Sequence, residues 1–193
     1  MIRITGGVAR GVQLRPPARA TTRPTSDRVR AAIFNILARW GPAGWRVLDL
    51  YAGTGSLGIE ALSRGATWAD FVERDARQCA LLRENLSLAG FADRGAVWCT
   101  TVERALSQLT GPYDGVLLDP PYRLGTLDPV LERLALEAPL APHALVVVEH
   151  GKHLALKERY GDPSAGPERA LVRVEGPRRY GDTVVEFFRR GGG

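Results

Sequence analysis

The sequence predicts an α/β protein with a seven-stranded, mostly parallel sheet, an antiparallel edge strand, and an N-terminal β-hairpin and helix. The first observation is an alternation: from Trp45 onward, short apolar runs typical of strands are followed by segments of helical periodicity. Such alternation indicates parallel strands connected by helices that cover both faces of a doubly wound sheet. The second observation concerns the end of the chain, where strand-like runs at 170–175 and 183–189 flank a short turn at 176–181. A connection this short favours antiparallel pairing.

The first 40 residues are expected to form the hairpin and the helix. Residues 2–4 lead into a Gly-Gly pair, and residues 12–14 can pair back across that turn. A Pro- and Thr-rich connector at 16–24 has little capacity for regular structure. The helix is predicted at 26–39, with Ser26 or Thr25 as its cap and Gly41-Pro42 as its end. Its apolar positions recur at helical spacing: Val29, Ile33, Ile36, Leu37 and Trp40.

The central part of the chain supplies five parallel strands and four helices. The strands are expected at 46–50, 68–73, 96–99, 113–118 and 144–149, and the last is the most strand-like stretch of the sequence. The helices are expected at 57–64, 76–89, 102–108 and 127–135. Gly65 closes the first of these helices. In the second, Cys79, Leu82, Leu86 and Ala89 share one face.

The composition bounds the class of protein. The 193 residues are 45% hydrophobic and 24% charged, as in a soluble globular domain. No apolar run approaches the roughly 20 residues of a membrane-spanning helix, and no apolar segment typical of a secretory signal follows Met1. Cys79 and Cys99 show no metal-ligand spacing, and neither do the three histidines. We therefore expect a cytoplasmic protein without a structural disulfide or a metal.

The positive charge is concentrated at the N-terminus. Residues 1–40 contain eight arginines and one acidic residue, whereas the remaining residues carry 18 basic and 20 acidic side chains. A basic block attracts polyanions, most obviously nucleic acid. The alternative is a solvated basic face with no partner. We therefore predict two parts: a basic, nucleic-acid-binding extension at 1–40 and a second domain at 41–193.

A glycine-rich motif follows the first strand of the alternating region. It runs from Asp49 to Gly58 and contains the pattern G-x-G-x-x-G at Gly53, Gly55 and Gly58. Ligands bind at this edge of an open α/β sheet, and glycines let the backbone approach them closely. Glu73, at the end of the next strand, is placed to bind ribose hydroxyls. The pattern is shared by nicotinamide enzymes and methyltransferases, and a tight turn without ligand is the structural alternative.

A second motif separates these possibilities. Asp119-Pro120-Pro121-Tyr122 ends the strand at 113–118, on the same sheet edge as the glycine motif. The lone pair of an aromatic amine is delocalised into its ring, so methylation of that nitrogen requires orientation more than a strong base. Asp119 can accept one N–H hydrogen bond and the Pro120 carbonyl the other. Tyr122 can stack on the base. A Pro-Pro turn with no chemical role is the structural alternative.

These motifs carry a resemblance to a known family. Asp49–Gly55 resembles motif I of class I methyltransferases, and Asp119–Tyr122 resembles their amino-methylating motif. Three further stretches narrow the resemblance: Arg3-x-x-Gly6-Gly7-x-x-Arg10-Gly11, then Arg23-Pro24-Thr25-x-Asp27-Arg28-Val29-Arg30 with Phe34-Asn35, and Gly58–Ala66. Together they resemble the RsmD family of bacterial enzymes, which methylate the 2-amino group of a guanine in 16S ribosomal RNA. The resemblance covers residues 2–190.

The resemblance implies a Rossmann-like fold, S-adenosyl-L-methionine as cofactor, and direct displacement in which the guanine amine attacks the sulfonium methyl group. It implies cofactor contacts at Asp49, Tyr51, Ala52, Gly53, Thr54, Gly55, Glu73, Thr101 and Val102. Thr101-Val102-Glu103 departs from the Asp or Asn that often lies beside the adenine. RNA contacts are implied at Arg3, Arg10, Arg23, Thr25, Arg28 and Arg30. The implied partner is 16S rRNA in the small ribosomal subunit or its assembly intermediate, bound by a monomer.

Three other functions remain open on the sequence. An N6-adenine methyltransferase acting on RNA or DNA would use the same Asp-Pro-Pro-Tyr motif. A nicotinamide oxidoreductase would use the glycine motif but would leave Asp119–Tyr122 and the basic N-terminus unexplained. A non-catalytic RNA-binding assembly factor would retain the fold without turnover, and the intact Asp119–Tyr122 motif argues against it.

Overall fold

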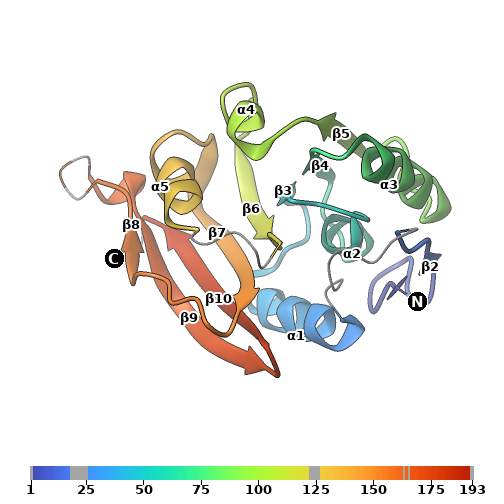
Figure 1. Ribbon diagram of the computed structural model, residues 1–193, viewed down its shortest axis with the longest axis horizontal. Helices are drawn as coiled ribbons and strands as arrows, with labels where there is room; N and C mark the ends of the chain where they lie inside the picture. The colour runs from blue at the N-terminus through green and yellow to red at the C-terminus, as the bar shows by residue number, and fades with distance from the viewer. Residues whose placement is uncertain (1, 18–25, 122–126, 163, 165, 192–193) are drawn as a thin grey trace.

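The computed structural model describes residues 2–17, 26–121, 127–162, 164 and 166–191. Within them, eight strands form one sheet in the order β5-β4-β3-β6-β7-β10-β9-β8 (Figure 1). The strands are β3 (Arg46–Leu50), β4 (Trp68–Glu73), β5 (Gly95–Cys99), β6 (Tyr113–Leu118), β7 (Leu140–Gly151), β8 (Arg159–Tyr160), β9 (Leu171–Tyr180) and β10 (Thr183–Arg190). The expected α/β fold with a mostly parallel sheet and an antiparallel edge is confirmed, with one strand more than the seven expected.

The parallel half of the sheet aligns the strand ends that carry the two motifs. β3 lies between β4 and β6 and is parallel to both, and β7 is parallel to β6. Leu50 pairs with Val72 on one side and with Leu118 on the other. The residues that follow these strands therefore meet at one edge of the sheet, as predicted.

The antiparallel part differs in two details from the prediction. The turn expected at 176–181 is shorter, because β9 continues to Tyr180, which pairs with Thr183. Gly176 adopts a φ of 97° at an irregularity of the ladder, and a Cβ there would lie 2.8 Å from the Val185 carbonyl oxygen. The glycine thus marks a bulge inside a strand, not a turn. The additional strand β8 has only two residues and carries no alternation that the sequence could reveal.

Helices cover both faces of the sheet. They are α1 (Asp27–Leu37), α2 (Ser56–Ser63), α3 (Ala76–Leu88), α4 (Val102–Leu106) and α5 (Asp128–Leu136). α1, α2 and α3 pack on one face and share a core with inward residues such as Val47 and Leu117. α4 and α5 pack on the other face against Leu48 and Leu118. No helix among the described residues is both long and apolar enough to cross a membrane.

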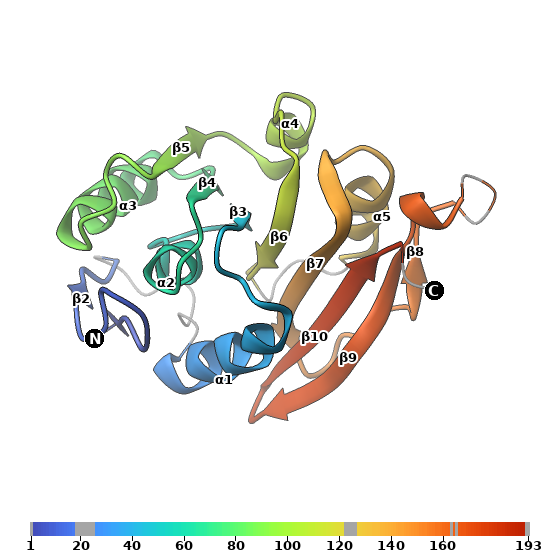
Figure 2. The same cartoon turned by 180° about the vertical axis from the view of Figure 1, so that it is seen from behind.

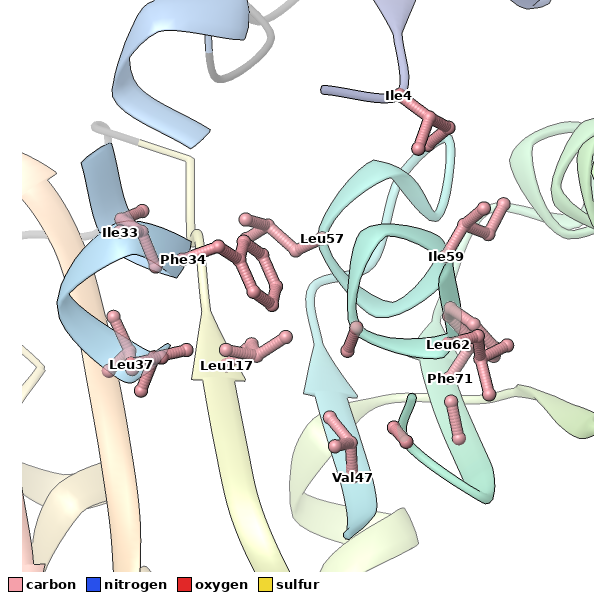
Figure 3. Packing of buried hydrophobic residues seen from close by; sticks show 14 of the residues in the cluster. Ile4, Ile33, Phe34, Leu37, Val47, Leu57, Ile59, Leu62, Phe71 and Leu117 are labelled. Atoms are coloured by element: carbon pink, nitrogen blue, oxygen red, sulfur yellow. The ribbon is translucent and has the colours of Figure 1, made fainter. Parts of the chain in front are cut away.

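The N-terminal hairpin, β1 (Ile2–Arg3) with β2 (Gln13–Leu14), lies beside α2 and α3, far from β8 and β9 (Figures 1 and 2). Ile2, Ile4 and Leu14 are buried in the same core as α1 and α2. In Figure 3, Phe34 of α1 lies between Leu57 of α2 and Leu117 of β6. The side chains of the hairpin and of α1 are thus continuous with the core of the sheet.

Candidate active site

The loop between β3 and α2 is built from left-handed backbone conformations. Tyr51, Gly53 and Gly55 have φ values of 60°, 53° and 79°. The Gly55 N–H donates to the Ala52 carbonyl at 2.7 Å, and the Ala52 N–H donates to the Val72 carbonyl at 3.0 Å. Left-handed conformations cost little for glycine but are strained for tyrosine. The loop is therefore a tight turn fixed to the end of β4.

The two glycines of this loop serve different purposes. A Cβ on Gly55 would lie 2.9 Å from Leu82 Cγ of α3, so this glycine permits close packing inside the protein. A Cβ on Gly53 would meet nothing nearer than the Tyr51 carbonyl oxygen at 4.0 Å. The backbone at Gly53 therefore faces open space, where a ligand can approach it.

Asp49 fixes the start of α2 from inside the protein. Its side chain is 1% exposed, and Oδ2 accepts a hydrogen bond from the Gly58 N–H at 2.8 Å. Burial raises the pKa of Asp49 to about 8, and the neighbouring carboxylates of Asp119 and Glu73 also favour its neutral form. The structure thus brings the carboxylates of Asp49, Glu73 and Asp119, all predicted site residues, close enough to interact.

Glu73 connects the end of β4 to the glycine loop. Oε2 accepts the Gly53 N–H at 3.0 Å, and Oε1 accepts the Asp75 N–H at 2.8 Å. Each carboxylate oxygen has two lone pairs, so both oxygens retain capacity for ribose hydroxyls. Glu73, which is predicted to bind the ribose hydroxyls, therefore also holds the glycine loop in place.

The residues after β5 lie next to this region but are engaged in their own helix. The Thr100 N–H donates to the Glu73 carbonyl at 3.0 Å. Thr101 caps α4, its hydroxyl accepting the Arg104 N–H at 3.4 Å, and Val102 is buried in the core. The Tyr51 hydroxyl, in contrast, is buried with no partner among the described residues. Burial and the nearby Glu103 raise its pKa to about 12.

Asp119, Pro120 and Pro121 follow β6 at the same edge. Pro120 is buried, and Asp119 and Pro121 are half-buried. Both prolines line a cavity of about 320 Å³ on the side of β7. Tyr122 lies outside the described residues. Because β6 is the strand between β3 and β7, Asp119-Pro120 stands between the glycine loop and this cavity.

The predicted RNA-contacting arginines divide into two groups. Arg3, Arg10 and Arg28 are exposed, whereas Arg30 is 0% exposed. Arg30 pairs with Asp27 at 2.7 Å and with buried Glu60 at 3.3 Å, and it donates to the Arg3 carbonyl. The expected RNA contact by Arg30 is wrong in this structure, because its guanidinium balances a buried carboxylate instead. Arg23 and Thr25 lie outside the described residues.

Glu60 of α2 anchors the hairpin. Its carboxylate accepts hydrogen bonds from the Thr5 N–H at 2.8 Å and hydroxyl at 2.7 Å, and it pairs with Arg64 at 2.7 Å. Gly7, at a φ of 77°, packs so closely on α2 that a Cβ would lie 1.8 Å from the Ser63 carbonyl oxygen. The Gly-Gly pair of the N-terminal motif is thus a docking surface as well as a turn.

Asn85 is a structural residue of the site that the sequence analysis missed. Its side chain is 0% exposed on α3. Nδ2 donates to the Thr54 carbonyl at 3.0 Å and the Arg15 carbonyl at 3.2 Å, and Oδ1 accepts the Arg15 N–H at 2.8 Å. A signal was present, because Asn85 follows Leu82 at helical spacing on the apolar face of this helix.

The residues of the glycine loop fit S-adenosylmethionine. The open backbone at Gly53, the carboxylate of Glu73 and the unpartnered hydroxyl of Tyr51 present donors and acceptors of the kind an aminoacyl-nucleoside requires. The nearby carboxylates also suit a ligand that bears a sulfonium cation.

Comparisons with known proteins agree with this fold. The model of the family described as "Conserved hypothetical protein 95" matches residues 2–171. Ribosomal RNA small subunit methyltransferase D of Escherichia coli (strain K12) is 39% identical over 150 residues, which are 77% of this chain and 74% of that protein. The solved structure of a hypothetical protein from Thermus thermophilus has a TM-score of 0.78 at 30% identity, covering 97% of this chain and 98% of that one.

A more distant solved structure shares the fold. It is an RNA methyltransferase from Salinibacter ruber in complex with S-adenosyl-L-homocysteine, with a TM-score of 0.58 at 20% identity, covering 87% of this chain and 94% of that one. The fold and the site define a class I, S-adenosylmethionine-dependent methyltransferase. Within that class, the chain belongs to the family described as "Conserved hypothetical protein 95", the RsmD family.

Proposed function

We propose that this protein transfers a methyl group from S-adenosylmethionine to the exocyclic 2-amino group of a guanine in small-subunit ribosomal RNA. The observation that carries the proposal is the position of Asp119-Pro120, after the strand next to the glycine loop and at the same sheet edge. The name of the Escherichia coli relative supports small-subunit rRNA as the substrate. The exposed arginines of the N-terminal hairpin and α1 support an RNA partner.

The chain contributes orientation more than acid–base strength. When bound, the cofactor supplies an electrophilic methyl group on a sulfonium sulfur. Asp119 accepts one N–H of the target amine and the Pro120 carbonyl accepts the other, so the two hydrogen bonds hold the nitrogen with its lone pair directed at the incoming methyl group. The proton that the amine loses passes to Asp119 or to water. Glu73 and the glycine loop would hold the cofactor, and Asp119 follows the strand that lies between this loop and the cavity.

The proposed substrate is a guanine in the small ribosomal subunit or its assembly intermediate, and the proposed enzyme is a cytoplasmic monomer. Residues 1–40 serve as its RNA-binding extension, with Arg3, Arg10 and Arg28 facing solvent. The remaining residues, 41–193, form the catalytic domain. This proposed division concerns function and not folding, because side chains of both regions share one core.

The test is methyl transfer from labelled S-adenosylmethionine to small subunits that lack their native modifications. The labelled RNA is digested and the modified nucleoside identified. Label in 2-methylguanosine is the expected result. Label in methyladenosine would retain the amine chemistry but overturn the base assignment, and no incorporation despite cofactor binding would indicate a different substrate or a non-catalytic protein.

A further inference from the structure

The cavity beside Pro120 lies on the far side of Asp119 from the glycine loop. In the sheet, the glycine loop follows β3, Asp119 follows the neighbouring β6, and the cavity lies at the ends of β6, β7 and the β9–β10 turn. Its volume of about 320 Å³ is at the lower end of the roughly 300–1,000 Å³ of small-molecule pockets. Its lining comprises Pro120, Pro121, Leu127, Leu154, residues 150–153 and Asp182. A flat ring that enters this cavity contacts Pro120, and Asp119 precedes Pro120 in the chain.

An ion pair lies in the wall of this cavity, which the two prolines also line. Lys152 Nζ lies 2.8 Å from Asp182 Oδ1, and the Lys152 backbone N–H donates to the Asp182 carbonyl at 2.9 Å. The backbone bond fixes the two residues side by side, because it continues the β7–β10 ladder beyond Gly151 and Thr183. The side chains are 40% and 65% exposed. Exposed ion pairs of this kind contribute little to stability, so a ligand can separate the two side chains at low cost.

Lys152 offers hydrogen-bond donors next to the acceptors of Asp182, and this arrangement can distinguish guanine from adenine. An ammonium group only donates, and a carboxylate only accepts. The Watson–Crick edge of guanine presents the O6 acceptor, then the N1–H donor, then the 2-amino group. Adenine presents its amino donor and then the N1 acceptor, which is the reverse order. The Lys152–Asp182 pair is therefore complementary to guanine and mismatched to adenine.

We propose that Lys152 and Asp182 select guanine as the target base by binding its Watson–Crick edge. Lys152 donates to O6 and Asp182 accepts from N1–H, which leaves the 2-amino group to Asp119 and the Pro120 carbonyl. The apolar side chains of Pro121, Leu127 and Leu154 contact the ring. The proposal rests on the proposed function and extends it, since it assigns base specificity to residues outside both sequence motifs.

The selectivity follows from the cost of unpaired polar groups. An analogue that lacks O6 and N1–H displaces the water that solvates Lys152 and Asp182 in the open cavity but offers them no hydrogen bonds in return. Sites built to hydrogen-bond a substrate group discriminate against analogues that lack it by far more than apolar pockets do. 2-Aminopurine is such an analogue: it keeps the 2-amino group, lacks O6, and has an unprotonated N1.

The experiment compares methylation of small subunits that carry either guanosine or 2-aminopurine at the mapped target position. Single-turnover rates and apparent affinities give kcat/KM for the wild type, Asp182→Asn and Lys152→Met. We expect the wild type to prefer guanine by about 100-fold or more. Asp182→Asn should lower guanine methylation about tenfold, because a neutral amide oxygen replaces the charged acceptor of N1–H. It should spare 2-aminopurine, because the Asn amide can donate to its N1. Lys152→Met should lower guanine methylation and leave 2-aminopurine unchanged.

Matched controls separate base selection from folding and from general charge. Lys157→Met removes another ion-paired lysine, which lies 3.1 Å from Glu132, and Asp162→Asn changes another exposed turn carboxylate. S-Adenosylhomocysteine affinity should remain unchanged in all four variants. An equal loss on both bases, or no loss on either, would overturn the proposal. A wild type that binds cofactor but fails on guanine itself would refute the proposed function first, and this proposal with it.

Discussion

Asn85 joins the glycine loop to the N-terminal extension, because its side-chain amide donates to the Thr54 carbonyl at 3.0 Å while also bonding the backbone of Arg15. One buried amide on α3 therefore holds two segments that are 39 residues apart, as counted from Arg15 to Thr54. Residues that bind neither cofactor nor RNA can thus determine how both binding regions are shaped.

Replacing Asn85 with alanine should weaken both the fold and the cofactor site. The change leaves buried backbone groups unpaired, and we expect a loss of about 1–3 kcal/mol in the free energy of unfolding, measured in urea. The affinity for S-adenosylhomocysteine, measured by calorimetric titration, should fall because the glycine loop loses the hydrogen bond that holds the Thr54 carbonyl. Asn35→Ala, at an exposed position of α1, is the control and should leave both quantities unchanged. Retained affinity in Asn85→Ala would show that the amide stabilises the fold only.

Asp119→Ala should lower turnover by roughly 100-fold or more, because the target amine loses an orienting acceptor. Cofactor affinity should remain nearly unchanged, since the glycine loop and Glu73 hold the cofactor. Asp119→Asn, which keeps one acceptor oxygen, should fall between the wild type and alanine. Single-turnover methyl transfer and a binding titration measure the two effects separately. A loss of affinity that matches the loss of rate would contradict the orienting role.

Cofactor binding should depend on pH through Asp49. Its pKa of about 8 means that much of this carboxyl is neutral at pH 7 and ionises as the pH rises. A sulfonium cation favours the ionised form, so affinity for S-adenosylmethionine should increase from pH 6.5 to pH 9. S-Adenosylhomocysteine lacks the sulfonium but shares the α-amino group, so the ratio of the two dissociation constants isolates the effect. In Asp49→Asn this ratio should not vary with pH, and a constant ratio in the wild type would refute the linkage.

Gly7→Ala should destabilise the protein more than Gly11→Ala. Both glycines have positive φ values, 77° and 91°, so both substitutions carry the left-handed penalty of about 1–2 kcal/mol. Only at Gly7 would the new Cβ collide with backbone, 1.8 Å from the Ser63 carbonyl oxygen, whereas nothing lies within 4 Å at Gly11. Denaturant unfolding and limited proteolysis of the N-terminal segment measure the difference. Equal losses would mean that the hairpin does not pack on α2 in solution.

Substitution by glutamine should affect RNA binding at Arg28 and stability at Arg30. Arg28 is exposed, so its loss should reduce the salt dependence of RNA binding by about one phosphate contact without affecting stability. Arg30 is buried against Glu60, so its loss should cost about 3–5 kcal/mol in the free energy of unfolding. Filter binding over a range of salt concentrations and urea unfolding measure these effects. If Arg30→Gln reduced the salt dependence of RNA binding while the protein stayed stable, Arg30 would contact RNA after all.

The buried parallel strands could be predicted closely from the sequence. β3, β4 and β6 have the expected bounds, because each is an apolar run that ends at a polar or glycine-rich turn. The strand expected at 144–149 lies inside the longer β7, which begins at Leu140. That early start passes through Pro142 and His143, which lie at an irregularity of the β6–β7 ladder between the pairs Tyr113–Leu140 and Gly115–Leu145, and which have the composition of a loop.

The candidate site was predictable where chemistry determines the residue type, and less so where packing does. Asp49, Glu73 and Asp119 meet at one edge because strand order and polarity fix the ends of three neighbouring strands. Counting charge could not separate buried Arg30 from exposed Arg28. The helical spacing could have done so, because Arg30 shares a face with Ile33 and Phe34. The Lys152–Asp182 pair depends on a hairpin turn far away in the sequence and has no local signal.

The docking of the hairpin on α2 has a consequence for transplanting the basic extension to another methyltransferase. The stretch Arg3–Gly11 and the stretch Gly58–Ala66 are two halves of one contact, made by Thr5, Gly7, Glu60 and Ser63. A graft of the first stretch alone would carry a backbone shaped for a partner that the recipient lacks. The smallest transferable unit is therefore discontinuous in sequence: the hairpin together with the side of α2 on which it packs, inherited or engineered as a pair.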